Sequence, residues 1–523
     1  MKHSYITASL VAVLSVSSVD AKAVNTTPRL VVNITIDQLR ADYLEAFAPL
    51  YTYNGFKMLL SDGTVYTNVS YPFIPIDRAS AIASIVTGTT PYYNGISGDR
   101  WLDRKTLRPV FCVDDDNYSG IFTNEKSSAA KMTSSTLCDE LKISTEGKAV
   151  VVSVSPFRDA AVISAGHAAD GAFWINDETG LWCSSNYYMK EIPSWLTTYN
   201  LYHSPSATIK DLTWRPLTPN ITFNYITGKR FDKSFKHAFS GSRKYRELKT
   251  SGCVNGEVTD MALQCVSNYF MGDDERTDML NLTYYAGLFD GMSTEASQME
   301  IQDTYIRLDT EIGRLVTELH KKIGDAHVLF VITGTDYQGK ENIDYARYNI
   351  PTGTVYINRT ASLLNLYFGA IYGEGRYVES CFRNEIYLNH ALFEAKHLNF
   401  SDALDRAHEF LLQSEGVKDV YTYNRLMLGE GTELFRKIRN GYNPDRRGDL
   451  LVNIASGWHL INEDTQENYS VNASPSQFPI IIYGAGTKAE KISAPTTIDR
   501  LAPTIAKTIH IRAPNACSVE PIF

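Results

Sequence analysis

The chain has 523 residues, of which 44% are hydrophobic and 21% charged, proportions typical of a globular protein with a large buried core. Its net charge of −9 and the lack of a basic stripe argue against a nucleic-acid-binding role. Beyond the amino terminus, no apolar run approaches the roughly 20 residues that span a bilayer, so we predict a chain that does not cross the membrane.

The amino terminus has the pattern of a secretory signal. A basic start at Lys2 precedes an apolar stretch at residues 6–16, and Ala21 and Ala23 then provide small side chains at the spacing that signal peptidase recognises. We predict a signal peptide over residues 1–23 and a mature chain over 24–523. The protein is expected to be exported and to be periplasmic or associated with the outer membrane.

The first predicted strand covers residues 30–36, a nearly continuous apolar run that ends at Asp37. Such a run indicates a central parallel strand covered on both faces. An acidic residue at its carboxyl end is typical of a site at that edge of a sheet. A helix is predicted to follow over residues 41–47.

Further strands alternate with helices along the chain. Strands are predicted at residues 149–154, 327–332 and 478–483, a helix at 301–322, and an antiparallel strand near 449–452. This alternation predicts an α/β fold built on a mainly parallel sheet.

Two segments differ from this pattern. Residues of about 170–275 are aromatic and rich in loops, and residues of about 350–440 mix strands and helices. We predict that both are insertions that form a cap over the carboxyl edge of the sheet in a single domain.

Seven cysteines are present, and an odd number leaves at least one thiol unpaired. Cys253 and Cys265 are close enough in sequence to pair in an exported protein. No CxxC motif occurs, which gives a thiolate zinc site little support.

Several motifs then occur in a recognisable order. The segments are residues 36–44, the Ala-Ser-Ile-Val-Thr-Gly-Thr-Thr-Pro stretch at 83–91, residues 303–309, 441–449 and 502–506. Together they resemble the phosphate-irrepressible type of bacterial alkaline phosphatase, close to the nucleotide pyrophosphatase/phosphodiesterases. The resemblance spans nearly the whole chain. It implies an alkaline phosphatase-like three-layer sandwich with a mainly parallel central sheet and an inserted cap.

The resemblance implies a reaction on two zinc ions, one of which activates a Thr or Ser alkoxide. Asp37 matches the first metal ligand. Arg78 falls at the position of the nucleophile, and an arginine stays protonated and cannot attack phosphorus. Ser80 is a nearby hydroxyl, but two residues along a helix it points to another side.

The remaining ligand positions of the family also carry different residues. An Asp and a His are replaced by Leu288 and Met292, neither of which suits zinc. The later positions fall on Thr335, Asp336 and Asn468. Independently of any alignment, no histidine occurs at residues 238–319, 328–389 or 460–509. We therefore expect no metal and no cofactor where the family would use two zinc ions.

The residues that would meet phosphate are altered as well. Asp99 takes the place of the family's phosphate-contacting Asn, and a carboxylate there repels a phosphate dianion unless a cation neutralises it. The family's Lys-x-Arg pair corresponds to residues 157–159, where Arg158 is displaced by one position and is followed by Asp159. His167 is interpreted as a structural residue of an Ala-Gly-His motif rather than a catalytic base.

These replacements suggest a specific arrangement. We expect the four carboxylates Asp37, Asp99, Asp159 and Asp336 to converge, with Arg78 among them. Our hypothesis is that Arg78 is a built-in counter-ion that takes over the role of a metal cation. The alternatives are that Arg78 points to solvent, or that the carboxylates bind Mg²⁺ or Ca²⁺.

Three functions follow from this interpretation. The first is a pseudoenzyme that acts as a binding or scaffold subunit of a cell-envelope complex, with a Tyr-rich cap as the contact surface for a protein partner. The alternative is an active metal-dependent phosphomonoesterase or phosphodiesterase with a rearranged carboxylate site. A third is a binding protein for a small anionic or sugar ligand in the former cleft.

Overall fold

The computed structural model describes residues 27–218, 234–335, 345–469 and 477–523. The predicted signal peptide and Asp336 lie outside the described residues. A large mixed sheet forms the main body, with strand order β21-β2-β20-β12-β1-β11-β6-β7-β8-β5 and β22 beside β2. Its strands are β1 (Leu30–Asp37), β2 (Thr64–Ser70), β5 (Gly120–Ile121), β6 (Val151–Val154), β7 (Gly171–Ile175), β8 (Trp182–Ser185), β11 (Asp278–Tyr285), β12 (Val328–Gly334), β20 (Phe478–Gly484), β21 (Glu490–Ile492) and β22 (Thr496–Thr497).

The strands at the centre of this sheet are parallel and buried. β1 pairs in parallel with β11 on one side and β12 on the other, and all eight of its residues are buried. This confirms the prediction of a central strand covered on both faces. β20 pairs antiparallel with both β12 and β2, and β8 pairs antiparallel with both β7 and β5, so the sheet is mixed at both sides.

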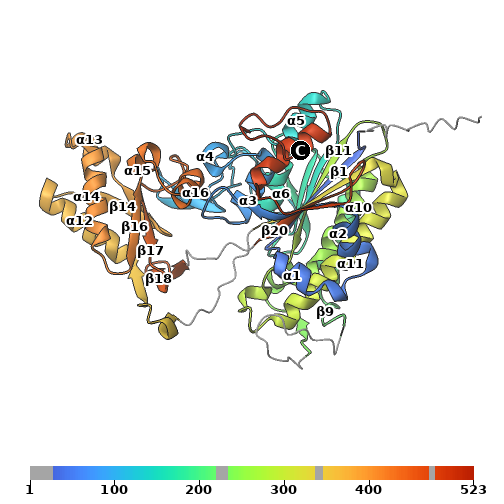
Figure 1. Ribbon diagram of the computed structural model, residues 1–523, viewed down its shortest axis with the longest axis horizontal. Coiled ribbons are helices and arrows are strands. Elements are labelled where there is room, and N and C mark those ends of the chain that lie inside the picture. Colours follow the sequence, from blue (N-terminus) through green and yellow to red (C-terminus); the bar gives the residue numbers. More distant parts are fainter. Residues whose placement is uncertain (1–26, 219–233, 336–344, 470–476) are drawn as a thin grey trace, which may run out of the picture.

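Helices cover both faces and make the expected three-layer sandwich (Figure 1). α3 (Arg78–Thr87), α5 (Leu137–Ser144), α6 (Arg158–Ala165) and α17 (Leu501–Thr508) pack together on one face. The other layer contains α2 (Met58–Asp62), α10 (Val254–Asn268) and the long α11 (Gln298–Ile323), with α1 (Ala41–Ala46) nearby. The α/β class, the first helix and the helix before β12 agree with the sequence predictions.

A second lobe, drawn in orange in Figure 1, lies to one side of the main sheet. It contains a four-stranded sheet of order β14-β15-β17-β16, a three-stranded sheet of order β13-β18-β19, and its own hydrophobic core. The strands are β13 (Gly353–Tyr356), β14 (Val378–Phe382), β15 (Glu385–Leu388), β16 (Val417–Thr422), β17 (Leu450–Ile454), β18 (Trp458–Asn462) and β19 (Glu467–Tyr469). The helices are α12 (Ile357–Tyr372), α13 (His390–Ala395), α14 (Phe400–Leu412), α15 (Tyr423–Leu428) and α16 (Glu433–Gly441).

Shorter elements complete the chain. They are the ribbon β3 (Arg100–Asp103) with β4 (Arg108–Phe111), the ribbon β9 (Thr213–Trp214) with β10 (His237–Ala238), and the helices α4 (Pro91–Asn94), α7 (Ser194–Tyr202), α8 (Pro205–Thr208) and α9 (Lys244–Lys249). β17 pairs antiparallel with both of its neighbours, as expected for the strand near 449–452. The predicted cap boundaries, about 170–275 and 350–440, stay predictions.

Two further sequence expectations concern membranes and thiols. None of the helices that the structure describes is long and apolar enough to cross a bilayer. All seven cysteines are free thiols, so Cys253 and Cys265 are not joined.

The second lobe is held against the loop that leads into α3. The main-chain NH of Ile74 donates to the carbonyl of Lys437 (3.0 Å), and the Asn440 amide donates to the carbonyl of Pro72 (2.9 Å). At the end of α16, Gly441 lies so close to Ile74 that an added Cβ would overlap its carbonyl oxygen. This contact requires glycine, because any larger residue pushes the lobe away from the main body.

We therefore predict that Gly441→Ala lowers the melting temperature, because backbone must move to relieve the overlap. Gly369→Ala in α12 is the matched control, since an added Cβ there meets no atom within 4 Å. That control should be neutral or stabilising by up to ~1 kcal/mol, because alanine favours helix. Thermal melts followed by circular dichroism measure both, and equal effects of the two substitutions would contradict the proposed contact.

Candidate functional site

The candidate site lies at the carboxyl edge of the sheet, where α3 begins. Asp77 caps this helix: its Oδ1 accepts from the main-chain NH of Ser80 (2.9 Å), and its own NH donates to the Ser80 hydroxyl (3.0 Å). This reciprocal capping box fixes the first turn and places Arg78 at the first helical position. Ser80 is fully buried within the cap, which makes it a poor candidate for a nucleophile.

Arg78 projects between two carboxylates from different elements. Its Nε donates to both oxygens of Asp159 (3.3 and 3.1 Å), its Nη2 donates to Asp159 Oδ1 (3.0 Å), and its Nη1 donates to Asp37 Oδ2 (3.3 Å). Asp37 ends β1 and Asp159 lies in the first turn of α6. Arg78 thus joins β1, α3 and α6 through charge-assisted hydrogen bonds.

The Asp37 carboxylate is the most deeply placed member of this group. Its side chain is 2% exposed, against 27% for Arg78, and its second oxygen accepts from the Thr335 hydroxyl (2.7 Å). Burial raises the pKa of Asp37, while Arg78 and the hydrogen bond from Thr335 oppose that shift. Burial likewise lowers the pKa of Arg78, but Asp159 and Asp37 more than offset it and raise this pKa above its usual value. The guanidinium therefore remains a cation.

A cation at the start of a helix is otherwise unfavourable. The amino end of a helix carries partial positive charge and attracts anions. Arg78 is stable there because two carboxylates face it and because its guanidinium lies over the Phe157 ring, 3.8 Å from the ring centre. The guanidinium occupies the space before α3 that would otherwise suit an anion.

Asp99 is neutralised by a residue from the second lobe. Its carboxylate accepts from Arg383, which lies in the β14–β15 turn and adopts a left-handed backbone conformation (φ 53°). The main-chain NH of Asp99 donates to Asp77 Oδ2 (2.7 Å), which brings the two acidic residues together. Burial raises the pKa of Asp99, Asp77 adds to this effect, and Arg383 opposes it. The sequence analysis missed Arg383, because nothing near Asp99 in the chain signals it.

Arg158 does not join this group. It pairs with Asp114 (2.9 Å) and Glu125 (3.6 Å) and donates to the Ser127 hydroxyl (3.3 Å). The displacement by one position therefore directs this arginine to a neighbouring acidic patch. Asp159, the next residue, takes the place facing Arg78.

The loop that carries Leu288 and Met292 is anchored by apolar contacts. Leu288 packs against the main core, and Met292 packs against a small cluster that includes Trp214 and Phe289. Asp290, between these two residues in the sequence, forms an ion pair with Arg243 and not with Arg78. Hydrophobic contacts of Leu288 and Met292 therefore hold this loop in place.

Of the later ligand positions Thr335, Asp336 and Asn468, the structure places Thr335 in the site. Thr335 follows β12, and its hydroxyl accepts from the NH of Gln38 (2.8 Å) while donating to Asp37. Asn468 is exposed in β19 opposite Ile461, and no described contact links its side chain to Arg78. Asp336 lies outside the described residues.

The two zinc ions that the resemblance implies would each need several carboxylate or imidazole donors that are free to bind metal. One Asp37 oxygen is committed to Thr335 and the other to Arg78, and Leu288 and Met292 offer no suitable donors. Across the described parts of the chain, no group of three or more His, Cys, Asp or Glu side chains is arranged to hold a metal. The donor set does not fit a two-zinc centre of the family's type.

His167 has a structural role. Its Nδ1 bonds Asp139 (2.8 Å), and its Nε2 lies 3.1 Å from the Met132 carbonyl oxygen. A carboxylate and a carbonyl only accept, so both ring nitrogens donate and the ring is an imidazolium. The hydrogen bond to Asp139 raises the pKa of His167 accordingly.

A model of the family described as type I phosphodiesterase / nucleotide pyrophosphatase matches residues 31–476. The chain belongs to this family. Its relatives include alkaline phosphatase PhoV of Synechococcus elongatus, 28% identical over 93% of this chain and 91% of that protein. Alkaline phosphatase PafA of Elizabethkingia meningoseptica is 27% identical over 95% of this chain and 94% of that protein.

The fold of the family is shared as well. A crystal structure of wild-type PafA matches with a TM-score of 0.79 at 24% identity, covering 95% of this chain and 98% of that one. This match and the relatives confirm the predicted resemblance to the alkaline phosphatase superfamily. The alkaline phosphatase activity in these names is that of PhoV and PafA. For this chain, a function has to be argued from the residues around Arg78.

The first prediction from this site concerns Arg78. Arg78→Ala leaves the buried Asp37 without its cation, which we expect to lower the free energy of unfolding by about 3 kcal/mol. Arg108→Ala is the matched control, because Arg108 is exposed in β4 with no ion pair among the described residues. Thermal melts of both variants measure the effect. An unchanged melting temperature for Arg78→Ala would show that Arg78 is not a counter-ion.

The second prediction concerns His167. Because its folded pKa is raised, its contribution to stability is complete below the unfolded value of about 6.5 and is lost as pH rises through the folded pKa. The melting temperature of the wild type, relative to His167→Gln, should therefore fall as pH rises from about 6.5. A difference that is independent of pH would contradict the imidazolium assignment.

Proposed function

We propose that this protein is an exported member of the family that binds rather than cleaves, acting as a subunit or scaffold of a cell-envelope complex. The observation that carries this proposal is the position of Arg78. Its guanidinium stands at the start of α3, where the resemblance places the attacking hydroxyl, and it is bonded to Asp37. One internal ion pair thus occupies the positions that the resemblance gives to the nucleophile and to the first metal ligand.

The charges around it support the same proposal. Asp37 and Asp159 are paired with Arg78, and Asp99 is paired with Arg383. Each carboxylate already has a cation, so a metal would have to displace an arginine that is held by hydrogen bonds. A phosphate ester would meet the carboxylates of Asp99 and Asp159 in place of the family's amide and arginine.

Support for a protein partner comes from the second lobe. On α12, Leu363 and Leu366 are 55% and 68% exposed, and their spacing of three residues places them on the same side of the helix. Exposed leucines at helical spacing are typical of contact surfaces between proteins. This extends the predicted contact surface from the tyrosines of the cap to its leucines.

A second candidate is an active metal-dependent phosphomonoesterase or phosphodiesterase with a rearranged carboxylate site. The relatives favour this candidate over the first, because PhoV and PafA are both named alkaline phosphatases and each covers over 90% of the chain. Such a site would have to recruit Asp37, Asp159 and Asp99 after their arginines moved away.

One experiment separates the two candidates. Purified mature protein is analysed for metals by elemental mass spectrometry, and p-nitrophenyl phosphate turnover is measured with added Zn²⁺, with PafA as the positive control. We expect no stoichiometric zinc and no turnover above buffer, because Arg78 holds the ligand oxygens. Stoichiometric metal together with turnover that Asp37→Ala abolishes would establish the second candidate instead.

A further inference from the structure

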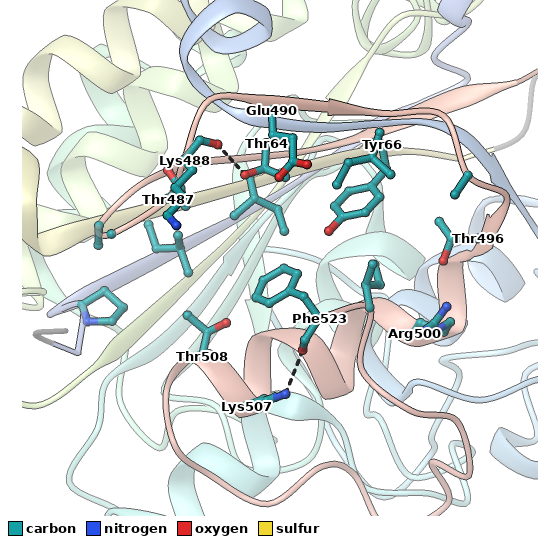
Figure 2. A pocket seen from close by; sticks show the side chains of 18 of the residues that line it. Thr64, Tyr66, Thr487, Lys488, Glu490, Thr496, Arg500, Lys507, Thr508 and Phe523 are labelled. Atoms are coloured by element: carbon teal, nitrogen blue, oxygen red, sulfur yellow. Dashed lines mark hydrogen bonds between the residues drawn. The ribbon is translucent and has the colours of Figure 1, made fainter. Parts of the chain in front are cut away.

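A cavity of about 730 Å³ lies at the opposite edge of the main sheet from Arg78. Thr64 and Tyr66 of β2 line one wall, and Lys507 of α17 lines the other (Figure 2). The lining also includes Ile482 of β20 and Leu329 of β12. Leu329 lies near the start of β12 and Thr335 follows its end, so about 20 Å of strand separates the two sites. The volume is within the range of small-molecule pockets.

Two polar groups of this cavity lack a hydrogen-bond partner among the described residues. Thr496 is 7% exposed, and its hydroxyl oxygen is buried with no hydrogen-bond partner among the described residues. Tyr66 is 4% exposed, and in Figure 2 its phenol oxygen points into the open centre of the cavity. No described residue hydrogen-bonds this phenol, whose pKa burial and Glu490 raise, so it is a protonated donor. Unsatisfied groups of this kind call for a ligand or water.

Cations predominate around the cavity although the whole chain is acidic. Lys488, Arg500 and Lys507 line it, against Glu490 as the one acidic side chain of the lining. Arg500 donates to the carbonyls of Glu520 and Pro521, and no ion pair of Lys488 occurs within the described parts of the chain. Positive charge in a concave site concentrates anions there.

Phe523 of this chain occupies part of the cavity and shows which chemical groups fit there. The ring of Phe523 lies within it, and the main-chain oxygen of Phe523 accepts from Lys507 Nζ (3.0 Å) (Figure 2). An apolar group and an oxygen acceptor therefore already fit side by side. An ammonium has three N–H donors, so Lys507 has two more for a second acceptor.

We infer that this cavity is a binding site for an amphipathic organic carboxylate. The carboxylate head receives hydrogen bonds from Lys507 and the Tyr66 phenol. The apolar body packs on Ile482, Leu329 and Ile492, which supply the hydrophobic part of the lining. This inference goes beyond the proposed function, because it concerns the far edge of the sheet and holds whether or not the Arg78 site is active.

The test uses decanoate as the probe, by calorimetry and thermal shift on the mature protein. We expect saturable binding that Lys507→Gln weakens about tenfold, the loss of one charge-assisted hydrogen bond. Tyr66→Phe should weaken it about fivefold. Decan-1-ol and decylamine carry the same tail without the negative charge, and both should bind more weakly than decanoate.

The matched control is Lys491→Gln. Lys491 lies in β21 between Glu490 and Ile492 and pairs with Val65 of β2. Because side chains alternate along a strand, Lys491 is on the face opposite to Glu490 and Ile492 and does not line the cavity. Its substitution should leave decanoate binding unchanged. The inference is overturned by the absence of saturable binding, by decylamine binding as tightly as decanoate, or by Lys491→Gln weakening binding as much as Lys507→Gln.

Discussion

The electrostatic neutralisation of Asp37 is the constraint on which the carboxyl edge of the sheet depends. A carboxylate that is 2% exposed cannot stay ionised in a protein interior without a cation and hydrogen bonds. In the family that cation is a metal, by the resemblance, and here it is the guanidinium of Arg78. The exchange keeps the charge balance with a covalently attached cation, and it fixes the mutual positions of β1, α3 and α6.

A second set of ion pairs extends the same principle to the second lobe. Arg383 reaches from the β14–β15 turn to Asp99, and the buried Arg447 pairs with Glu385 (2.5 Å) and donates to the carbonyl of Ser97 (2.5 Å). The bonds of Arg383 to Asp99 and of Arg447 to Ser97 cross between the lobe and the segment after α3, whereas Arg447 and Glu385 both belong to the lobe. Removing one partner would leave a buried charge unpaired, so these pairs specify how the lobe sits more than they add to stability.

The sequence could predict those features that are local or that depend on ordered motifs. The apolar run before Asp37 indicated a central strand, and the ungapped motif around residues 83–91 indicated where Arg78 would fall. The partner of Asp99 could not be predicted, because Arg383 is 284 residues away and its approach depends on a turn in another lobe. Likewise, the replacement of Asp and His by Leu288 and Met292 indicated a lost ligand pair, but not that Met292 would join the Trp214 cluster. Packing partners of this kind depend on tertiary geometry, which no local pattern encodes.

The two edges of the sheet differ in what a ligand must displace. At the carboxyl edge, an anion or a metal has to break the bonds of Arg78 to Asp37 and Asp159, and this energy is subtracted from its affinity. At the amino edge, Lys488 and the Tyr66 phenol have no partners to give up among the described residues, and Lys507 has donors to spare. A ligand of modest intrinsic affinity can therefore bind at the amino edge, whereas the carboxyl edge accepts only one that compensates two buried carboxylates. A ligand therefore has fewer bonds to displace at the amino edge than around Arg78.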